Sequence, residues 1–261
     1  MIKAKKSLGQ NFLIDKNILE KITNITNIKN KTILEIGPGT GNLTSYSLYK
    51  NPKKLIVVEK DNYLAQNLEE TFLCKLSVIN KDILEIDETK LSKKKMTVFG
   101  NLPYNISTEI LCRWITNFKE IFWFDHLILM FQKEVADRII AQSNTSAYGR
   151  LSILANWRLK INKIFDISPE SFSPKPKIQS SLIHFTPKKN FAEIKDPKNL
   201  EKITRIFFSH RRKMLKKPFN QIFNRNPDLI NKFNLDLNLR PQNLDFETYY
   251  KLTIEYEKLR S

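Results

Sequence analysis

The stretch Thr32-Ile-Leu-Glu-Ile-Gly-Pro-Gly-Thr-Gly41 joins an apolar run to a glycine-rich turn. The apolar run predicts a short buried parallel strand, and residues 43–48 continue with a helical pattern. The chain has six glycines, and three of them lie in this stretch. In open α/β sheets, a strand, a glycine turn and a helix together place a ligand at the helix N-terminus. A tight turn without a ligand needs the same glycines, so this stretch alone leaves both interpretations open.

The composition is strongly basic. The chain has 261 residues, with 44 Lys and Arg against 27 Asp and Glu, which gives a formal net charge of +17. This excess predicts a polyanionic partner, with nucleic acid favoured over an anionic membrane surface. The alternative is a lysine-rich surface that serves only solubility. The hydrophobic content of 41% is enough for a packed core, and the length fits one large domain or a domain with a small appendage.

Cysteine and histidine give no sign of a metal or redox centre. Cys74 and Cys112 are the only cysteines, and neither has a Cys or His neighbour at metal-ligand spacing. We therefore expect no disulfide and no bound metal, and free thiols suit a reducing cytosol. No apolar run approaches the length of a membrane span, so we expect a soluble cytoplasmic protein. His126, His184 and His210 lie in unrelated sequence contexts, so no catalytic histidine is predicted.

Further apolar runs predict the other strands of an α/β sheet, with helical patterns between them. Asp15 is expected to cap the first helix. The predicted strands cover residues 55–58, 76–79, 96–99 and 126–131, followed by a closing antiparallel pair at 157–167 and 178–185.

Acidic residues accompany the first three predicted strands. Glu35 precedes the glycine turn, Glu59 ends the second strand, and Asp82 follows the third. Glu59 lies roughly 20 residues after Gly37, where α/β nucleotide sites place a carboxylate that binds ribose. The alternative is a solvated acid at a strand end.

The acid, the G-x-G-x-G turn and the later strand-end acids resemble the cofactor site of class I S-adenosylmethionine-dependent methyltransferases. The dinucleotide fingerprint G-x-G-x-x-G fits less well, because Asn42 stands where its last glycine would fall. The resemblance implies a Rossmann-like α/β fold with a seven-stranded, mostly parallel sheet, and S-adenosylmethionine as cofactor. It also implies that Asp82 accepts a hydrogen bond from the adenine amino group of that cofactor. The implied cofactor residues in this region are Glu35, Gly37, Gly39, Glu59 and Asp82.

The stretch Asn101-Leu-Pro-Tyr104 follows the fourth predicted strand. It resembles the (D/N/S)-P-P-(Y/F/W) motif of methyltransferases that modify exocyclic amines. An adenine amino group is a poor nucleophile, and the Asn101 side-chain oxygen and Leu102 carbonyl can accept both of its hydrogens and localise its lone pair. Pro103 would fix the turn and Tyr104 would stack on the base, while Asn101 would also border the cofactor. The alternative is a structural strand end that contains proline.

Two other segments resemble one methyltransferase family, the ribosomal RNA adenine dimethyltransferases. The first is Ser7-Leu-Gly-Gln-Asn-Phe-Leu13, in which the resemblance places Asn11 and Leu13 at the cofactor pocket. The second is Gln132-Lys-Glu-Val-Ala136, to which we assign no catalytic role. In the proline-rich loop before residue 178, Phe172 would stack on the target adenine opposite Tyr104. Packing of Phe172 within its own loop is the alternative.

The pattern changes to short helices near residues 186–197, which predicts two domains, 1–188 and 189–261. Residues 204–217 include six basic residues and no acid, with interleaved apolar residues that predict a helix packed on one face. The basic cluster resembles the part of the family's C-terminal domain that contacts ribosomal RNA, so Arg211, Arg212 and Lys213 are the implied RNA-binding residues. A helix whose charges are only solvated is the alternative.

The resemblance covers nearly the whole chain and implies a specific reaction. In this family, methyl groups pass from S-adenosylmethionine to N6 of two adjacent adenosines near the 3′ end of 16S ribosomal RNA. We therefore expect a monomeric enzyme that acts on the immature small ribosomal subunit. The alternatives are a large-subunit RNA methyltransferase of the antibiotic-resistance type and an assembly factor that only grips RNA.

Overall fold

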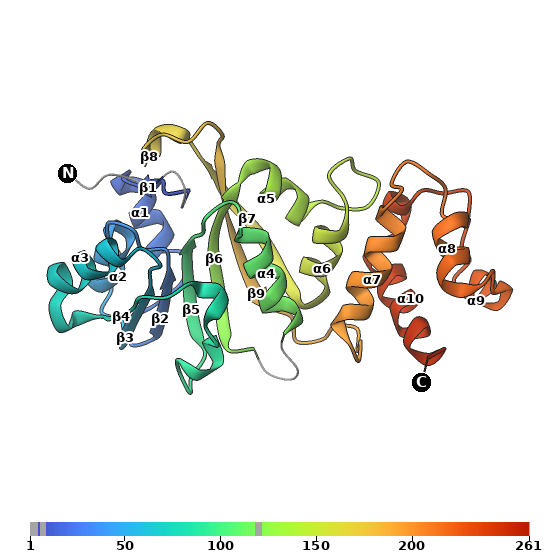
Figure 1. Ribbon diagram of the computed structural model, residues 1–261, viewed down its shortest axis with the longest axis horizontal. Helices are drawn as coiled ribbons and strands as arrows, with labels where there is room; N and C mark the ends of the chain where they lie inside the picture. The colour runs from blue at the N-terminus through green and yellow to red at the C-terminus, as the bar shows by residue number, and fades with distance from the viewer. Residues whose placement is uncertain (1–4, 6–8, 118–121, 261) are drawn as a thin grey trace. The chain divides into compact units, whose positions relative to one another are not determined.

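The computed structural model of the protein describes residues 5, 9–117 and 122–260. Its contacts divide it into two compact units (Figure 1). The first unit takes the described residues of 1–110, 119–136 and 161–187. The second takes those of 111–118, 137–160 and 188–261, so it includes two earlier segments as well as the region after the predicted boundary at 188.

The central element is a seven-stranded sheet with the strand order β4-β3-β2-β5-β6-β9-β7. Neighbouring strands from β4 to β6 are parallel, and β9 runs antiparallel to β6. This confirms the predicted seven-stranded, mostly parallel sheet. A separate two-stranded sheet pairs β1 with β8. The strands are β1 (Phe12–Leu13), β2 (Thr32–Ile36), β3 (Lys54–Val58), β4 (Ser77–Ile79), β5 (Met96–Asn101), β6 (Phe124–Gln132), β7 (Leu159–Ile167), β8 (Phe172–Ser173) and β9 (Ser180–Pro187).

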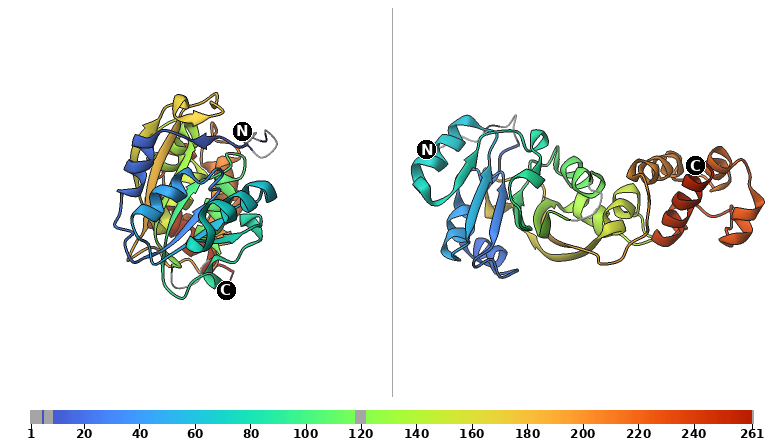
Figure 2. Two further views of the ribbon diagram at one scale, coloured as in Figure 1. Left: turned by 90° about the vertical axis from the view of Figure 1, so that its left-hand side faces the viewer. Right: turned by 90° about the horizontal axis from the view of Figure 1, so that it is seen from below.

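Helices connect the strands, and several begin at the residue type expected of an N-cap. Asp15 accepts hydrogen bonds from the Asn17 and Ile18 amides, which confirms it as the cap of α1, and Asp61 caps α3 in the same way. The α-helices are α1 (Lys16–Thr23), α2 (Asn42–Tyr49), α3 (Asn62–Phe72), α4 (Ser107–Thr116), α5 (Lys133–Ile140), α6 (Arg150–Arg158), α7 (Pro197–Phe208), α8 (Lys216–Phe223), α9 (Pro227–Lys232) and α10 (Phe246–Lys258). The described residues after 187 form helices and turns, coloured orange to red in Figures 1 and 2, without a strand. No helix within the described ranges is long and apolar enough to cross a membrane.

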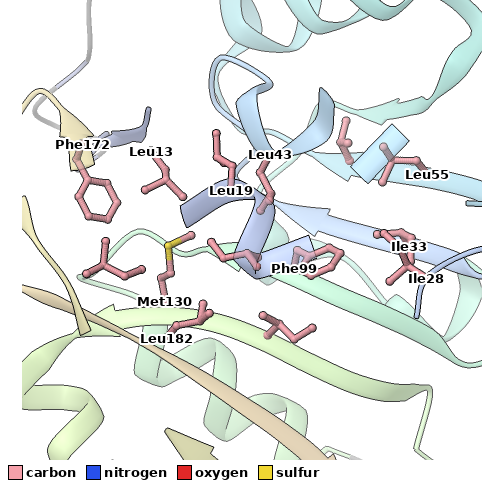
Figure 3. Packing of buried hydrophobic residues seen from close by; sticks show 14 of the residues in the cluster. Leu13, Leu19, Ile28, Ile33, Leu43, Leu55, Phe99, Met130, Phe172 and Leu182 are labelled. Atoms are coloured by element: carbon pink, nitrogen blue, oxygen red, sulfur yellow. The ribbon is translucent and has the colours of Figure 1, made fainter. Parts of the chain in front are cut away.

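A hydrophobic cluster holds β1 and β8 against one face of the sheet (Figure 3). Leu13 and Phe172 lie at its edge, above Met130 of β6 and Leu182 of β9. Both side chains are buried, with exposed fractions of 5% and 3%. Burying side chains of this size contributes roughly 1.5–3 kcal/mol each, so the two-stranded sheet is fixed to the core.

Three sequence-based expectations were wrong in detail. Trp157 belongs to α6, and strand β7 begins only at Leu159. The predicted helix over 204–217 is interrupted, because α7 ends at Phe208 and α8 begins at Lys216. His126 and His184 are not unrelated: their rings stack, and His126 Nδ1 lies 2.8 Å from His184 Nε2.

Candidate active site

A cavity of about 170 Å³ opens at the carboxyl ends of β2, β3 and β5. From β2 the chain continues to β3 on one side of the sheet, and from β5 it continues to β6 on the other side. The position between β2 and β5 is therefore a topological switch point, where ligands of open α/β sheets bind. The lining residues are Gly9, Gln10, Asn11, Phe12, Gly37, Gly39, Glu59, Lys60, Asp82, Asn101, Leu102, Pro103, Tyr104, Asn105 and Ile106.

The glycine turn forms the floor of this cavity. Gly37 and Gly39 have φ angles of +66° and +59°, which residues with a Cβ rarely adopt. A Cβ on Gly37 would lie 3.1 Å from the Asn101 carbonyl oxygen, and one on Gly39 would lie 2.6 Å from the Phe12 ring. Glycine therefore serves both the turn and the close approach of two neighbouring segments.

Glu59 ties the second strand end to the glycine turn. Its carboxylate accepts hydrogen bonds from the amides of Gly39, at 3.1 Å, and Asp61, at 2.9 Å. Burial raises the pKa of Glu59, and these two backbone donors oppose the rise. The carboxylate is thus held in place at the cavity wall by backbone groups.

Asp82 lies on the same wall and is paired with Lys60. The Lys60 ammonium donates to Asp82 Oδ2 at 2.7 Å, and the Leu84 amide donates to Asp82 Oδ1 at 3.0 Å. Its carboxylate is thereby fixed at the cavity wall.

Asn101 is oriented by a hydrogen bond from a distant part of the chain. Its Nδ2 donates to the Asn11 carbonyl at 2.8 Å. Because the amide nitrogen makes this bond, the side-chain oxygen remains as the acceptor of the group. The arrangement leaves a fixed acceptor beside the glycine turn.

The rest of the Asn-Leu-Pro-Tyr stretch extends along the cavity. The Leu102 side chain is buried, which holds the backbone at that point against the core. The Tyr104 hydroxyl lies 2.7 Å from Ser180 Oγ on β9, and burial raises its pKa, so it stays neutral. The ring is thereby fixed at its far end while its body lines the cavity.

Glu35 and Leu13 lie beneath the glycine turn, where they line a smaller cavity of about 20 Å³. Glu35 is 1% exposed, and its Oε2 has no hydrogen-bond partner in the described part of the chain. Burial raises the pKa of Glu35 to about 8, the Thr44 hydroxyl opposes this, and the nearby Glu59 charge adds to it. Glu35 therefore holds a proton at neutral pH.

The structure does not bring all the predicted residues together. Phe172 packs in the hydrophobic core with Leu13 and does not line the described cavity. Arg211, Arg212 and Lys213 follow α7 in the second unit, as part of the turn between α7 and α8. In the described residues no group of three or more His, Cys, Asp or Glu side chains could hold a metal.

Sequence reasoning missed several side chains that line the cavity, among them Gln10, Phe12 and Lys60, and it missed Asp61, which binds Gln10. Gln10 donates to Asp61 Oδ2 at 3.2 Å, and Lys5 pairs with the same oxygen at 2.9 Å. Burial alone would raise the pKa of Asp61, but the hydrogen bonds from Lys5 and Gln10 lower it. The available signal was position: Lys60 and Asp61 directly follow Glu59, and Gln10 and Phe12 flank Asn11.

Comparison with known proteins places the chain in one family. The family model described as ribosomal RNA adenine dimethylase matches residues 1–258. Proteins named ribosomal RNA small subunit methyltransferase A are 65% identical in Pelagibacter ubique, over 99% of both chains, and 44% identical in Ehrlichia ruminantium, over 95% of both.

Solved structures agree on the fold. A dimethyladenosine transferase from Plasmodium falciparum has a TM-score of 0.81 at 28% identity and covers 95% of this chain and 98% of its own. The 23S rRNA methyltransferase ErmE has a TM-score of 0.70 at 18% identity, over 95% of this chain and all of its own, and this likeness concerns the fold alone. The sheet order, the cavity at the switch point and the match over nearly the full length lead to one conclusion: the chain belongs to the ribosomal RNA adenine dimethylase family.

Proposed function

We propose that this protein dimethylates N6 of two adjacent adenosines near the 3′ end of 16S ribosomal RNA in the immature small subunit. The observation that carries the proposal is the orientation of Asn101, whose amide nitrogen is bound to Asn11 and whose oxygen is left as an acceptor. Membership of the family, and relatives named for the small subunit, support the choice of substrate. The enzyme would then work in the cytoplasm, where ribosomal subunits mature.

The cavity fits S-adenosylmethionine as the methyl donor. Gly37 and Gly39 line the cavity without side chains and in a left-handed backbone conformation, so the backbone of the turn can lie close to a ligand. Glu59 and Asp82 supply carboxylates for the ribose hydroxyls and the adenine amino group. Glu35 would supply a buried oxygen, without a partner among the described residues, to a hydrogen-bond donor of the cofactor. When bound, S-adenosylmethionine supplies an electrophilic methyl group on a good leaving group.

The residues of this chain then prepare the target amine. Asn101 Oδ1 and the Leu102 carbonyl accept the two amino hydrogens, which favours a pyramidal nitrogen with a localised lone pair. Because Asn11 and the Pro103 ring fix these acceptors beforehand, little reorganisation is needed at the moment of transfer. The Tyr104 ring, held by Ser180, offers a face to stack on the base. The nitrogen gives up a proton after transfer, when it has become acidic.

Phe172 is proposed as a second stacking surface only with a rearrangement of β8. In the present arrangement its ring belongs to the core beside Leu13. Single-turnover rates of Phe172→Leu would test this, since a conservative apolar change keeps the core filled and removes the aromatic face. A rate equal to that of the wild type would leave Tyr104 as the only stacking ring.

The test of the function is transfer of labelled methyl groups. Small subunits from cells that lack this modification, incubated with tritiated S-adenosylmethionine, should gain two methyl groups on each of two adjacent adenosines. Large subunits are the control. Label only on large subunits would favour the antibiotic-resistance type, and binding to small subunits without label would favour a non-catalytic assembly factor.

A further inference from the structure

The amino ends of the parallel strands carry a second, unassigned concentration of charge. Four short segments, 29–31, 50–54, 73–76 and 92–95, immediately precede or begin β2, β3, β4 and β5. They contain no acidic residue and no arginine. Their lysines, which we call the amino-edge lysines, are Lys29, Lys31, Lys50, Lys53, Lys54, Lys75, Lys93, Lys94 and Lys95.

The strand register sets these lysines side by side. Thr32 of β2 pairs with Lys54 of β3 on one side and Met96 of β5 on the other. Segments 31, 53–54 and 95 are therefore neighbours along one edge, with adjacent strands about 4.8 Å apart. The pairing of Ile56 with Ser77 extends the row to Lys75. The charges form a band across four strands.

Two of the four segments, 29–31 and 50–54, are joined by backbone hydrogen bonds. The Asn30 amide donates to the Asn51 carbonyl at 3.1 Å, and the Lys53 amide donates to the Lys31 carbonyl at 2.8 Å. Asn30 and Asn51 both have positive φ angles, which suits tight turns. The two segments before β2 and β3 are thus held together as one part of the band.

Most of these lysines have no ion-pair partner among the residues that the structure describes. Lys31 pairs with Asp125 at 3.1 Å, and the Lys50 ammonium donates to Asn24. The other seven are exposed, and none of them has a carboxylate within ion-pair distance in the described ranges. Solvated like charges held this close repel one another, and a bound polyanion relieves that repulsion.

The band does not belong to the cofactor cavity. It lies at the opposite end of β2 from Gly37, and five residues of strand span roughly 17 Å. Charges at that distance are separated by more than the screening length of about 8 Å at physiological salt. The lysines would also repel a cofactor that carries a positive charge.

We propose that the amino-edge lysines form a second RNA-binding surface, which holds the phosphate backbone of the ribosomal RNA away from the reacting base. This rests on the proposed function, since it takes the substrate to be ribosomal RNA. Lysines without arginine suit point-charge contacts with phosphates and carry no base readout. Tyr49, 83% exposed and next to Lys50, adds an aromatic face on which an unpaired base can stack.

The test compares two variants with the same net charge. One is Lys53→Gln/Lys54→Gln/Lys94→Gln/Lys95→Gln, and the other replaces Lys16, Lys195, Lys198 and Lys251, four exposed lysines outside the edge, by Gln. Binding to a small-subunit RNA fragment is titrated without cofactor from 50 to 200 mM salt. The edge variant should lose about tenfold or more in affinity at low salt. The magnitude of its salt slope should fall by roughly 3 if all four lysines contact phosphates, since each lost contact removes about 0.7–0.9.

Three results would overturn the proposal. Equal losses in both variants would mean that only net charge matters. An unchanged slope in the edge variant would mean that these lysines do not touch RNA. Loss of binding to phosphatidylglycerol vesicles with RNA binding intact would identify a membrane surface instead. Unchanged S-adenosylmethionine affinity in both variants reports that the fold is intact. This test measures RNA binding and not methyl transfer. If the wild type binds RNA but methylates nothing, the proposed function is wrong, whereas the proposed RNA-binding surface is still supported.

Discussion

The two ends of the central sheet present opposite kinds of polar surface. At the carboxyl end, Glu59 and Asn101 are held by hydrogen bonds from segments far along the chain. At the amino end, exposed lysines such as Lys53 and Lys94 extend into solvent. In a partly buried site, loss of a single fixed group has a large effect on binding or rate, because water cannot take its place. Each solvated charge contributes little by itself. The contributions of many such charges add together, and they decrease as the salt concentration rises.

The largest expected effect lies at the end where groups are fixed. Asn101→Ala removes the oriented acceptor, so the single-turnover methyl-transfer rate should fall by roughly 10²-fold or more while RNA still binds. Asn17→Ala, an exposed asparagine of α1 that does not line the cavity, is the control and should stay within a few-fold. A near-normal rate in Asn101→Ala would show that the oriented amide is structural.

A smaller effect is expected for cofactor binding. Glu59→Ala should weaken S-adenosylmethionine binding by about 1.5–3 kcal/mol, the range for hydrogen bonds to a charged group. Glu85→Ala, an exposed acid that does not line the cavity, is the control. Calorimetry on folded protein is the measurement, and equal affinities for both variants would remove Glu59 from the site.

The sequence was sufficient for the parts of this site that are local in the chain. The apolar run, the glycine turn and Glu59 follow one another in β2 and β3, so their order alone predicted a common edge. The bond from Asn101 to Asn11 joins residues 90 apart, and no local pattern indicates it. Phe172 was predicted to stack on the target adenine, but its ring is buried in the hydrophobic core with Leu13 and Met130.

The errors in the fold have the same origin. Helix α6 ends at Arg158 and β7 begins at Leu159, with no turn residue between them. The apolar pattern alone therefore could not locate this junction, and the strand was predicted to begin at Trp157. Residues 209–215 have ordinary helix formers, yet Arg211 donates to the Thr145 and Ser146 carbonyls. A contact across more than 60 residues thus accompanies a turn that propensity did not predict.

The protonation of Glu35 can be used to test whether the carboxyl end of the sheet binds a positively charged ligand. Burial raises its pKa to about 8, whereas an unfolded chain has a Glu pKa of about 4.3. Between these values the folded state keeps a proton that the unfolded state loses, so this contribution to stability is complete below about pH 4.3 and is lost as the pH rises through about 8.

The variant Glu35→Gln should therefore flatten the pH dependence of the free energy of unfolding between pH 5 and 8, by about 1 kcal/mol per pH unit. Urea unfolding at several pH values measures it. In wild type, S-adenosylmethionine binding at pH 7 should also release a proton, seen as binding enthalpies that depend on the ionisation enthalpy of the buffer. Identical pH profiles for the two proteins would mean that Glu35 is already ionised in the fold.

The smallest expected effect concerns two adjacent arginines that repeat the contrast between fixed and solvated groups. Arg211 is half-buried and donates to the Thr145 and Ser146 carbonyls and to Gln242, whereas Arg212 is exposed. Both were predicted to bind RNA, but only Arg212 has a side chain free to reach a phosphate without breaking these bonds. Arg212→Ala should therefore lower the salt slope of RNA binding by about 0.7–0.9 and leave stability unchanged. Arg211→Ala should instead lower the free energy of unfolding by about 0.5–1.5 kcal/mol, because it removes the hydrogen bonds that tie this turn to Thr145, Ser146 and Gln242, and should change the slope little. Salt titrations and urea unfolding of both variants, with S-adenosylmethionine affinity as the control, measure the two quantities. The reverse result, a slope change in Arg211→Ala alone, would mean that RNA binding draws Arg211 away from its carbonyl partners, and that this turn rearranges when the substrate binds.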